Sequence, residues 1–402
     1  MKIWQRIGVY VAVALLVVPA PQGALAASLS GRSSTVFEWF DDPQEDTALV
    51  GYEYLRLNIS DIADGYRFTG YGRLAEDFAD EFEIKNRLYY AYLEKTDLVP
   101  ALDFRLGRQF ISTSAGASVM DGLNLEYRDL GGFDVKLFGG GDVSYYEGYN
   151  ADDLIVGGEL EVSLADIADL GLSYLQKWQD QDLSHELIGF DANIRLADSF
   201  NLYNETQYSW LTDEVTYLLA GAKYSGHPRW GARLEYLYSL PVFSATSIYS
   251  VFAVAEYQEV SAELTYRIDR GLRVFGRYVR EIYDEVDDAG VVELGLEKLC
   301  TARLAGYLVG TWRNDDDGQD LHGVKAYGSW RITETFDAGL GAHVDSLERR
   351  LEEDDETTST RIWVDGTAYF SRTLSLQAKV EYVESDLWDE YYRGRVRLNV
   401  HF

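Results

Sequence analysis

The chain ends in the stretch YYRGRVRLNVHF, residues Tyr391 to Phe402. In an extended strand, successive side chains point to opposite faces. One face of this stretch carries Tyr392, Gly394, Val396, Leu398, Val400 and Phe402, and the other carries Arg393, Arg395, Arg397, Asn399 and His401. An apolar face opposite a charged face is the pattern of a strand that lies between lipid and a wet interior. The stretch therefore predicts a transmembrane β-strand.

The same alternation recurs upstream, for example in Val324–Ile332, Phe336–Val344 and Val260–Ile268, and no helical period runs over a useful length. Short, weakly charged connections such as 129–132 and 333–335 alternate with longer acidic ones such as 142–153, 314–320 and 348–356. Counting strands between the connections predicts about 22, in a range of roughly 18 to 24. Transmembrane β-barrels of bacterial outer membranes have an even number of strands, which agrees with this count. Pro241–Gln258 breaks the rhythm and is interpreted as a long apolar external loop rather than two further strands.

The predicted fold class is all-β: a transmembrane antiparallel up-and-down β-barrel that forms one domain, residues 27–402. Residues 1–26 are predicted to be a signal peptide. Lys2 and Arg6 precede the apolar run Ile7–Val18, and Ala24-Leu25-Ala26 fits the cleavage pattern. The composition agrees with a barrel, because 30 Tyr, 17 Phe and 9 Trp accompany only 6 Pro.

Motifs for catalysis and cofactor binding are not found. The single cysteine, Cys300, leaves no CxxC or CxxCH motif, and the five histidines are scattered without metal-ligand spacing. We therefore expect no cofactor, no metal site and no enzymatic activity. A formal net charge of −31 also argues against nucleic-acid binding.

Charge is distributed unevenly along the sequence. The long connections hold acidic runs, whereas the polar faces of the predicted strands hold many basic residues. Two interpretations stay open: the charges pair across strands and keep the interior wet, or a basic lumen attracts anions. The candidate lumen residues are Arg105, Arg233, Arg267, Arg273, Arg331, Arg361, Arg393, Arg395 and Arg397.

Two segments resemble known outer-membrane proteins. Leu106-Gly107-Arg108-Gln109, followed by Asp121-Gly122-Leu123, resembles a segment common in bacterial outer-membrane porin families. Alternation places Arg108 and Asp121 on one face of adjacent strands, so an ion pair could clamp the loop Gln109–Met120, with a role either in the hairpin alone or also in permeation. The last strand resembles the signal read by the outer-membrane assembly machinery, carried here by Gly394, Val396, Leu398, Val400 and Phe402.

The resemblance implies a porin in the outer membrane of a Gram-negative bacterium, in which small hydrophilic solutes or ions diffuse passively. The lumen could be open, narrowed by an inward loop (Gln109–Met120 or Pro241–Gln258), or filled by a periplasmic or other partner protein. In the last case the chain would be similar to the barrels that sheath multihaem cytochromes in electron conduits. Strands predicted from the cleavage site onward argue against an N-terminal plug. The expected partners are lipid, lipopolysaccharide and the assembly machinery.

Overall fold

The computed structural model describes residues 28–402, except 42–46, 63–64, 80–83, 145–147, 166, 241–255, 285–286, 300–302, 316–319, 349–355 and 387. The predicted signal peptide and Cys300 lie outside the described residues. None of the described residues form a helix long and apolar enough to cross a membrane. The described regular structure consists of β-strands, which form one 22-stranded sheet.

The strands are β1 (Ser28–Asp41), β2 (Thr47–Ser60), β3 (Arg67–Asp77), β4 (Arg87–Val99), β5 (Leu102–Thr113), β6 (Gly116–Tyr127), β7 (Phe133–Ser144), β8 (Gly148–Leu164), β9 (Ala168–Gln179), β10 (Asp182–Leu196) and β11 (Phe200–Ser209). They continue with β12 (Glu214–Tyr224), β13 (Trp230–Ser239), β14 (Tyr257–Arg267), β15 (Leu272–Tyr283), β16 (Ala289–Lys298), β17 (Leu304–Asp315), β18 (Leu321–Thr333), β19 (Phe336–Glu348), β20 (Glu356–Tyr369), β21 (Leu374–Ser385) and β22 (Trp388–His401).

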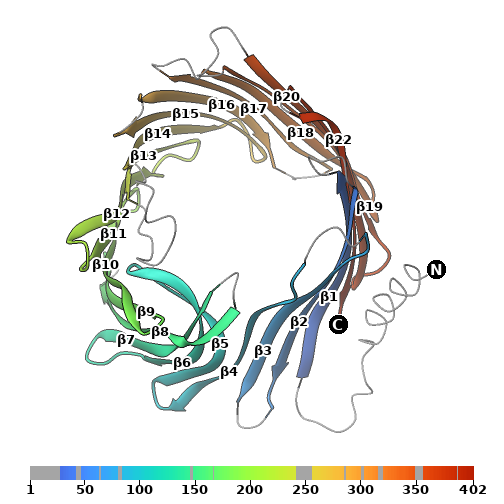
Figure 1. Ribbon diagram of the computed structural model, residues 1–402. Helices are drawn as coiled ribbons and strands as arrows, with labels where there is room; N and C mark the ends of the chain where they lie inside the picture. The colour runs from blue at the N-terminus through green and yellow to red at the C-terminus, as the bar shows by residue number, and fades with distance from the viewer. Residues whose placement is uncertain are drawn as a thin grey trace. The chain divides into compact units, whose positions relative to one another are not determined.

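The sheet closes on itself because β1 pairs antiparallel with both β2 and β22 (Figure 1). The predicted barrel of about 22 antiparallel strands is thereby confirmed. Contacts divide the chain into two compact units. The first unit holds β1–β3 and β17–β22, the second holds β5–β14, and β4, β15 and β16 are divided between them.

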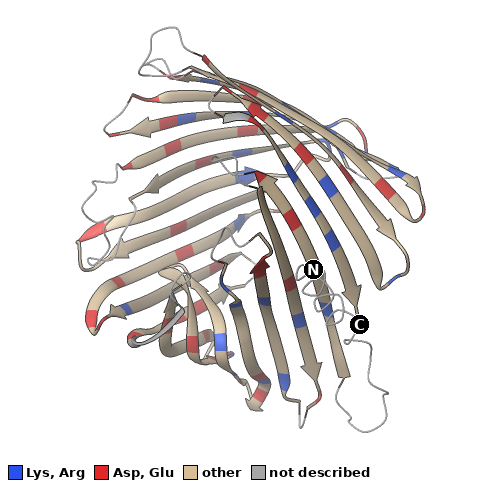
Figure 2. Cartoon of the chain, turned by 45° about the vertical axis from the view of Figure 1, so that its right-hand side comes forward, with Lys and Arg blue, Asp and Glu red and all other residues tan. Residues whose placement is uncertain are grey.

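The two faces of the strands differ in chemistry, as the alternation predicts. On β8, β9 and β10 the side chains of Leu160, Leu172 and Phe190 are exposed on one face. The opposite face, on these strands and on β7, carries charged groups such as Lys136 of β7 and Glu159 of β8, which form an ion pair of 3.1 Å. Figure 2 shows such basic and acidic positions spaced along the strands. We call the apolar face outer and the charged face inner, because lipid contacts the apolar side of a membrane barrel.

The predicted short connections coincide with breaks between strands, for example at 129–132 and 333–335. In the turn between β14 and β15, the amide of Gly271 donates a 2.7 Å hydrogen bond to the carboxylate of Asp269. This hydrogen bond lowers the pKa of Asp269, because it stabilises the charged form.

Two predicted loops are wrong in their extent. The strands β7 and β8 run into the predicted loop 142–153, where Val143 pairs with Tyr149 across a register shift. The predicted loop Gln109–Met120 is itself two paired strands, because residues up to Thr113 pair with residues from Gly116 onward. Most of the third predicted loop, Pro241–Gln258, lies outside the described residues, and β14 begins at Tyr257.

The seam between the first and last strands involves the terminal residue. The amide of Gly31 donates to the carbonyl oxygen of Phe402 at 2.8 Å, and the amide of Phe402 donates to that of Gly31 at 3.2 Å. A Cβ atom on Gly31 would lie 2.6 Å from the Phe402 ring, so glycine leaves room for the ring at the seam. Gly394, Val396 and Leu398 of the predicted assembly signal lie on β22 at the same seam, opposite β1.

Candidate functional site

The β5–β6 hairpin separates from its neighbours in the wall. β5 pairs with β4 as far as Arg108, and β6 pairs with β7 from Met120 onward. Beyond these points, residues 109–113 of β5 pair with residues 116–120 of β6. The hairpin tip is therefore a separate two-stranded element, and only its base is part of the wall.

Glycines shape the base of the hairpin. Gly107 has φ +126°, a conformation that other residues adopt rarely. A Cβ atom on Gly122 would lie 2.2 Å from the carbonyl oxygen of Gly139 and 2.7 Å from the Cα atom of Gly140. The backbones of β6 and β7 approach closely here because neither carries a side chain at this contact.

One side of the hairpin tip packs against the inner face of the wall. Ile111, Ala115 and Met120 form a buried cluster with four wall residues, Phe138, Ile155, Leu175 and Leu187. The flanking residues Leu154, Val156 and Leu172 lie on the opposite, exposed face. The hairpin tip therefore folds inward over β7–β10 of its own unit (Figure 1).

Polar contacts fix the turn of the hairpin to the wall. The amide of Ala115 donates to Ser173 Oγ at 2.7 Å, and Gln207 Nε2 donates to the carbonyl oxygen of Ala115 at 2.8 Å. Lys177 Nζ also donates to Ser118 Oγ at 2.8 Å. A Cβ atom on Gly189 would lie 2.0 Å from the Ala115 nitrogen, so this glycine makes the approach of the turn possible. The hairpin is docked by both apolar and polar contacts.

The other side of the hairpin is turned away from the wall. Phe110 lies there and is 58% exposed. The register puts Arg108 and Asp121 on the same side as Phe110. Arg108 Nε and Nη2 donate to the two oxygens of Asp121 at 2.8 and 2.7 Å. The predicted ion pair is thus present at the hairpin base, and its role in permeation stays a prediction.

Five of the candidate lumen arginines are engaged by carboxylates. The ion pairs are Arg105–Glu94 (3.3 Å), Arg233–Glu263 (2.8 Å), Arg273–Glu297 (2.5 Å), Arg331–Asp337 (3.1 Å) and Arg361–Glu381 (3.3 Å). Each pair joins two neighbouring strands, as expected if the inner charges pair across strands and keep the interior wet. Such pairs keep the inner face polar without leaving much net charge.

The other four candidate lumen arginines are not paired with carboxylates in this way. In the part of the chain that the structure describes, Arg267, Arg393, Arg395 and Arg397 form no ion pair with an acid. Arg397 only donates a long hydrogen bond, 3.5 Å, to Ser34 Oγ. Three of the four follow one another on the inner face of β22, and the register places Arg32 and Arg56 opposite each other on β1 and β2. Arg32, Arg56, Arg393, Arg395 and Arg397 thus form a basic stripe, which fits the interpretation of a basic lumen that attracts anions.

Sequence reasoning missed two features of the inner face. One is a row of tyrosines beside the basic stripe, in which Tyr71 stacks on Tyr54 at 6.3 Å and on Tyr89 at 4.8 Å between ring centroids. The other is the apolar patch under the hairpin, formed by Phe138, Ile155, Leu175 and Leu187. The signal for the patch was present, because Ile155 stands between Leu154 and Val156 and interrupts the alternation.

Within the described ranges, no group of three or more His, Cys, Asp or Glu side chains is placed to hold a metal ion.

Comparison with known proteins yields matches in structure alone. No protein-family model matches the chain, and no curated protein matches it. Among solved structures, the siderophore receptor PirA from Pseudomonas aeruginosa is similar with a TM-score of 0.62 and 12% identity, over 94% of this chain and 81% of that one. The translocation pore of the P pilus usher PapC is similar with a TM-score of 0.53 and 9% identity, over 93% and 99%. OpdQ from Pseudomonas aeruginosa gives 0.50 and 10%, over 94% and 99%. The chain has the fold of these proteins.

Proposed function

We propose that the chain is a porin: a passive channel in the outer membrane of a Gram-negative bacterium for small hydrophilic solutes or ions. The observation that carries this proposal is the inward hairpin. Its tip leaves the wall, docks on the inner face through Ile111, Ala115 and Met120, and leaves Phe110 uncovered on its other side. A loop of this kind narrows a barrel without filling it.

The chemistry of the inner face supports the same function. Ion pairs such as Arg233–Glu263 and exposed arginines such as Arg393 cover it with groups that hold water. Channel selectivity arises from charged groups that line the pore. One of the similar structures is described as a translocation pore, which agrees with a transport function for this fold.

Single-channel recording of the purified protein in a planar lipid bilayer tests the proposal. We expect stable, defined current steps from the protein alone. A folded protein that produces no steps would refute a passive channel. Very large and noisy steps would instead favour a barrel that has lost a lumen-filling partner.

A further inference from the structure

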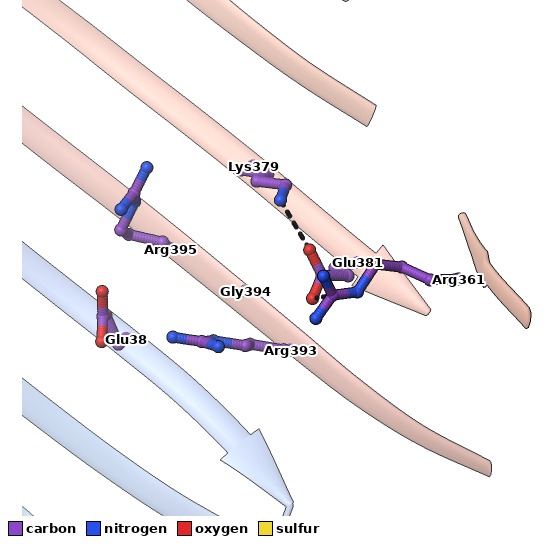
Figure 3. Close-up of a pocket in the computed structure, with 7 residues that line it drawn as sticks. All are labelled: Glu38, Arg361, Lys379, Glu381, Arg393, Gly394 and Arg395. Carbon is purple, nitrogen blue, oxygen red and sulfur yellow. Dashed lines mark hydrogen bonds and ion pairs between the residues drawn. The ribbon is translucent and has the colours of Figure 1, made fainter. Parts of the chain in front are cut away.

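A cavity on the inner face of the first unit gathers an unusual set of charges. It has a volume of about 180 Å³ and lies between β20, β21, β22 and β1 (Figure 3). Its charged lining residues are Glu38, Arg361, Lys379, Glu381, Arg393 and Arg395. Four cationic groups thus face two carboxylates, which leaves a surplus of two positive charges around the cavity.

The two carboxylates are used differently. Glu381 is buried and accepts from Lys379 Nζ at 2.5 Å and from Arg361 Nε at 3.3 Å, so one carboxylate engages two cations. Lys379 also lies over the ring of Trp363, 5.0 Å from its centroid. Arg361 and Lys379 are therefore held in place by groups of the wall.

Arg393 and Arg395 are not held in this way. Both are exposed, and neither has an acidic partner among the described residues. Figure 3 shows their side chains on either side of Gly394, with Glu38 facing them from β1. The register places Glu38 directly opposite Arg395, yet Glu38 makes no ion pair with a described residue. Two guanidinium groups thus remain available beside one unengaged carboxylate.

We propose that Arg393 and Arg395 bind an oxyanion group, a carboxylate or a phosphate, of a permeating solute, and that Glu38 is the counter-ion with which this group competes. The inference rests on the proposed channel function and names its substrate class. A guanidinium group donates two parallel hydrogen bonds to a carboxylate or a phosphate. Residues two apart on a strand are about 7 Å apart, so the two arginines could also hold two oxyanion groups of one small solute.

Glu38 gives the site a property that a channel needs. A binding site in a conducting pore must hold its ligand strongly enough for entry and weakly enough for release. When the solute leaves, the carboxylate of Glu38 can turn to either arginine and replace it. Glu38 therefore limits the affinity of the site and favours release.

The test measures how inorganic phosphate and succinate reduce the chloride current through single channels. In Arg393→Gln/Arg395→Gln we expect the half-blocking concentration to rise about tenfold or more, because the charge-assisted hydrogen bonds of both guanidinium groups to the oxyanion are lost. In Glu38→Gln it should fall, because the competitor is removed. Block by phosphate alone or by succinate alone would assign the site to that oxyanion.

Arg233→Gln is the matched control. It removes an inner-face arginine that is already paired with Glu263, at 2.8 Å, in the other unit. The site would be refuted if Arg233→Gln raised the half-blocking concentration as much as the double variant does. It would also be refuted if phosphate and succinate blocked the double variant as strongly as they block the wild type. A wild-type protein without channels would refute the channel instead, and calorimetric binding of phosphate to the detergent-purified protein would then test the site by the same comparison of variants.

Discussion

Removal of the apolar anchors of the hairpin should release it from the wall. The variant is Ile111→Ala/Met120→Ala. Both side chains are buried, with 1% and 0% exposure, and both lie in the cluster between hairpin and wall. A buried Ile or Met replaced by Ala costs about 2–5 kcal/mol. Because these side chains are buried only while the hairpin is docked, the loss falls on docking.

The lower bound of this range sets the smallest expected loss of docking free energy. Two such losses amount to at least about 4 kcal/mol, which lowers the ratio of docked to undocked hairpin by a factor of about a thousand. The barrel itself should persist, because β5 pairs with β4 as far as Arg108 and β6 pairs with β7 from Met120 onward, so these pairings hold the wall together without the hairpin tip.

Single-channel recording and heat-dependent migration on gels provide the assay. We expect a folded barrel with larger conductance and frequent fluctuations between levels. The control is Leu123→Ala, on the exposed outer face of the same strand β6, which should leave the current unchanged. Wild-type conductance and noise in a folded double variant would refute the view that the docked hairpin narrows the channel.

Three further changes test the hairpin base and the seam. Arg108→Ala should loosen the hairpin by about 1–3 kcal/mol, because it leaves the half-buried Asp121 without its partner; faster hydrogen exchange at the hairpin would show this, and Arg108→Asp/Asp121→Arg should partly restore protection. Gly122→Val should reduce the yield of folded barrel, because even a Cβ atom there would lie 2.2 Å from the Gly139 oxygen; an undiminished yield in gel migration would contradict the close approach. Phe402→Ala should slow assembly into the outer membrane, since the ring and backbone of Phe402 contact Gly31 at the seam. Pulse-chase measurement of folded protein would show the slower assembly, with Leu29→Ala as the control. Equal assembly rates for Phe402→Ala and the wild type would contradict this role of Phe402.

The number and direction of the strands could be predicted because lipid and water act on opposite faces of every strand. Residues such as Lys325 and Val324 report their faces directly through the period of two. The inward fold of 109–120 could not be read in this way, since the stretch pairs as a hairpin wherever it lies. Its signals were indirect: Gly107 and Gly122 at the base, and Ile155 on the polar face of β8.

The pairing of the arginines was also beyond the sequence. Whether an arginine meets a carboxylate depends on the register of strands, and β1 pairs with β22 from the other end of the chain. Glu381 on β21 lies directly opposite Arg393 on β22 and diagonally across from Arg361 on β20, yet of these two arginines only Arg361 forms an ion pair with it. The sequence alone does not distinguish Arg361 from Arg393, because packing decides which of the two pairs with Glu381 and which stays exposed.

Chemical modification of Phe110→Cys, in a Cys300→Ser background, tests the central claim most directly. Phe110 is exposed on the side of the hairpin that is turned away from the wall. A charged, membrane-impermeant thiol reagent added during single-channel recording should reduce the current in one discrete, irreversible step. Leu123→Cys on the outer face should not respond. An unchanged current in a labelled Phe110→Cys channel would contradict a pore that passes the hairpin.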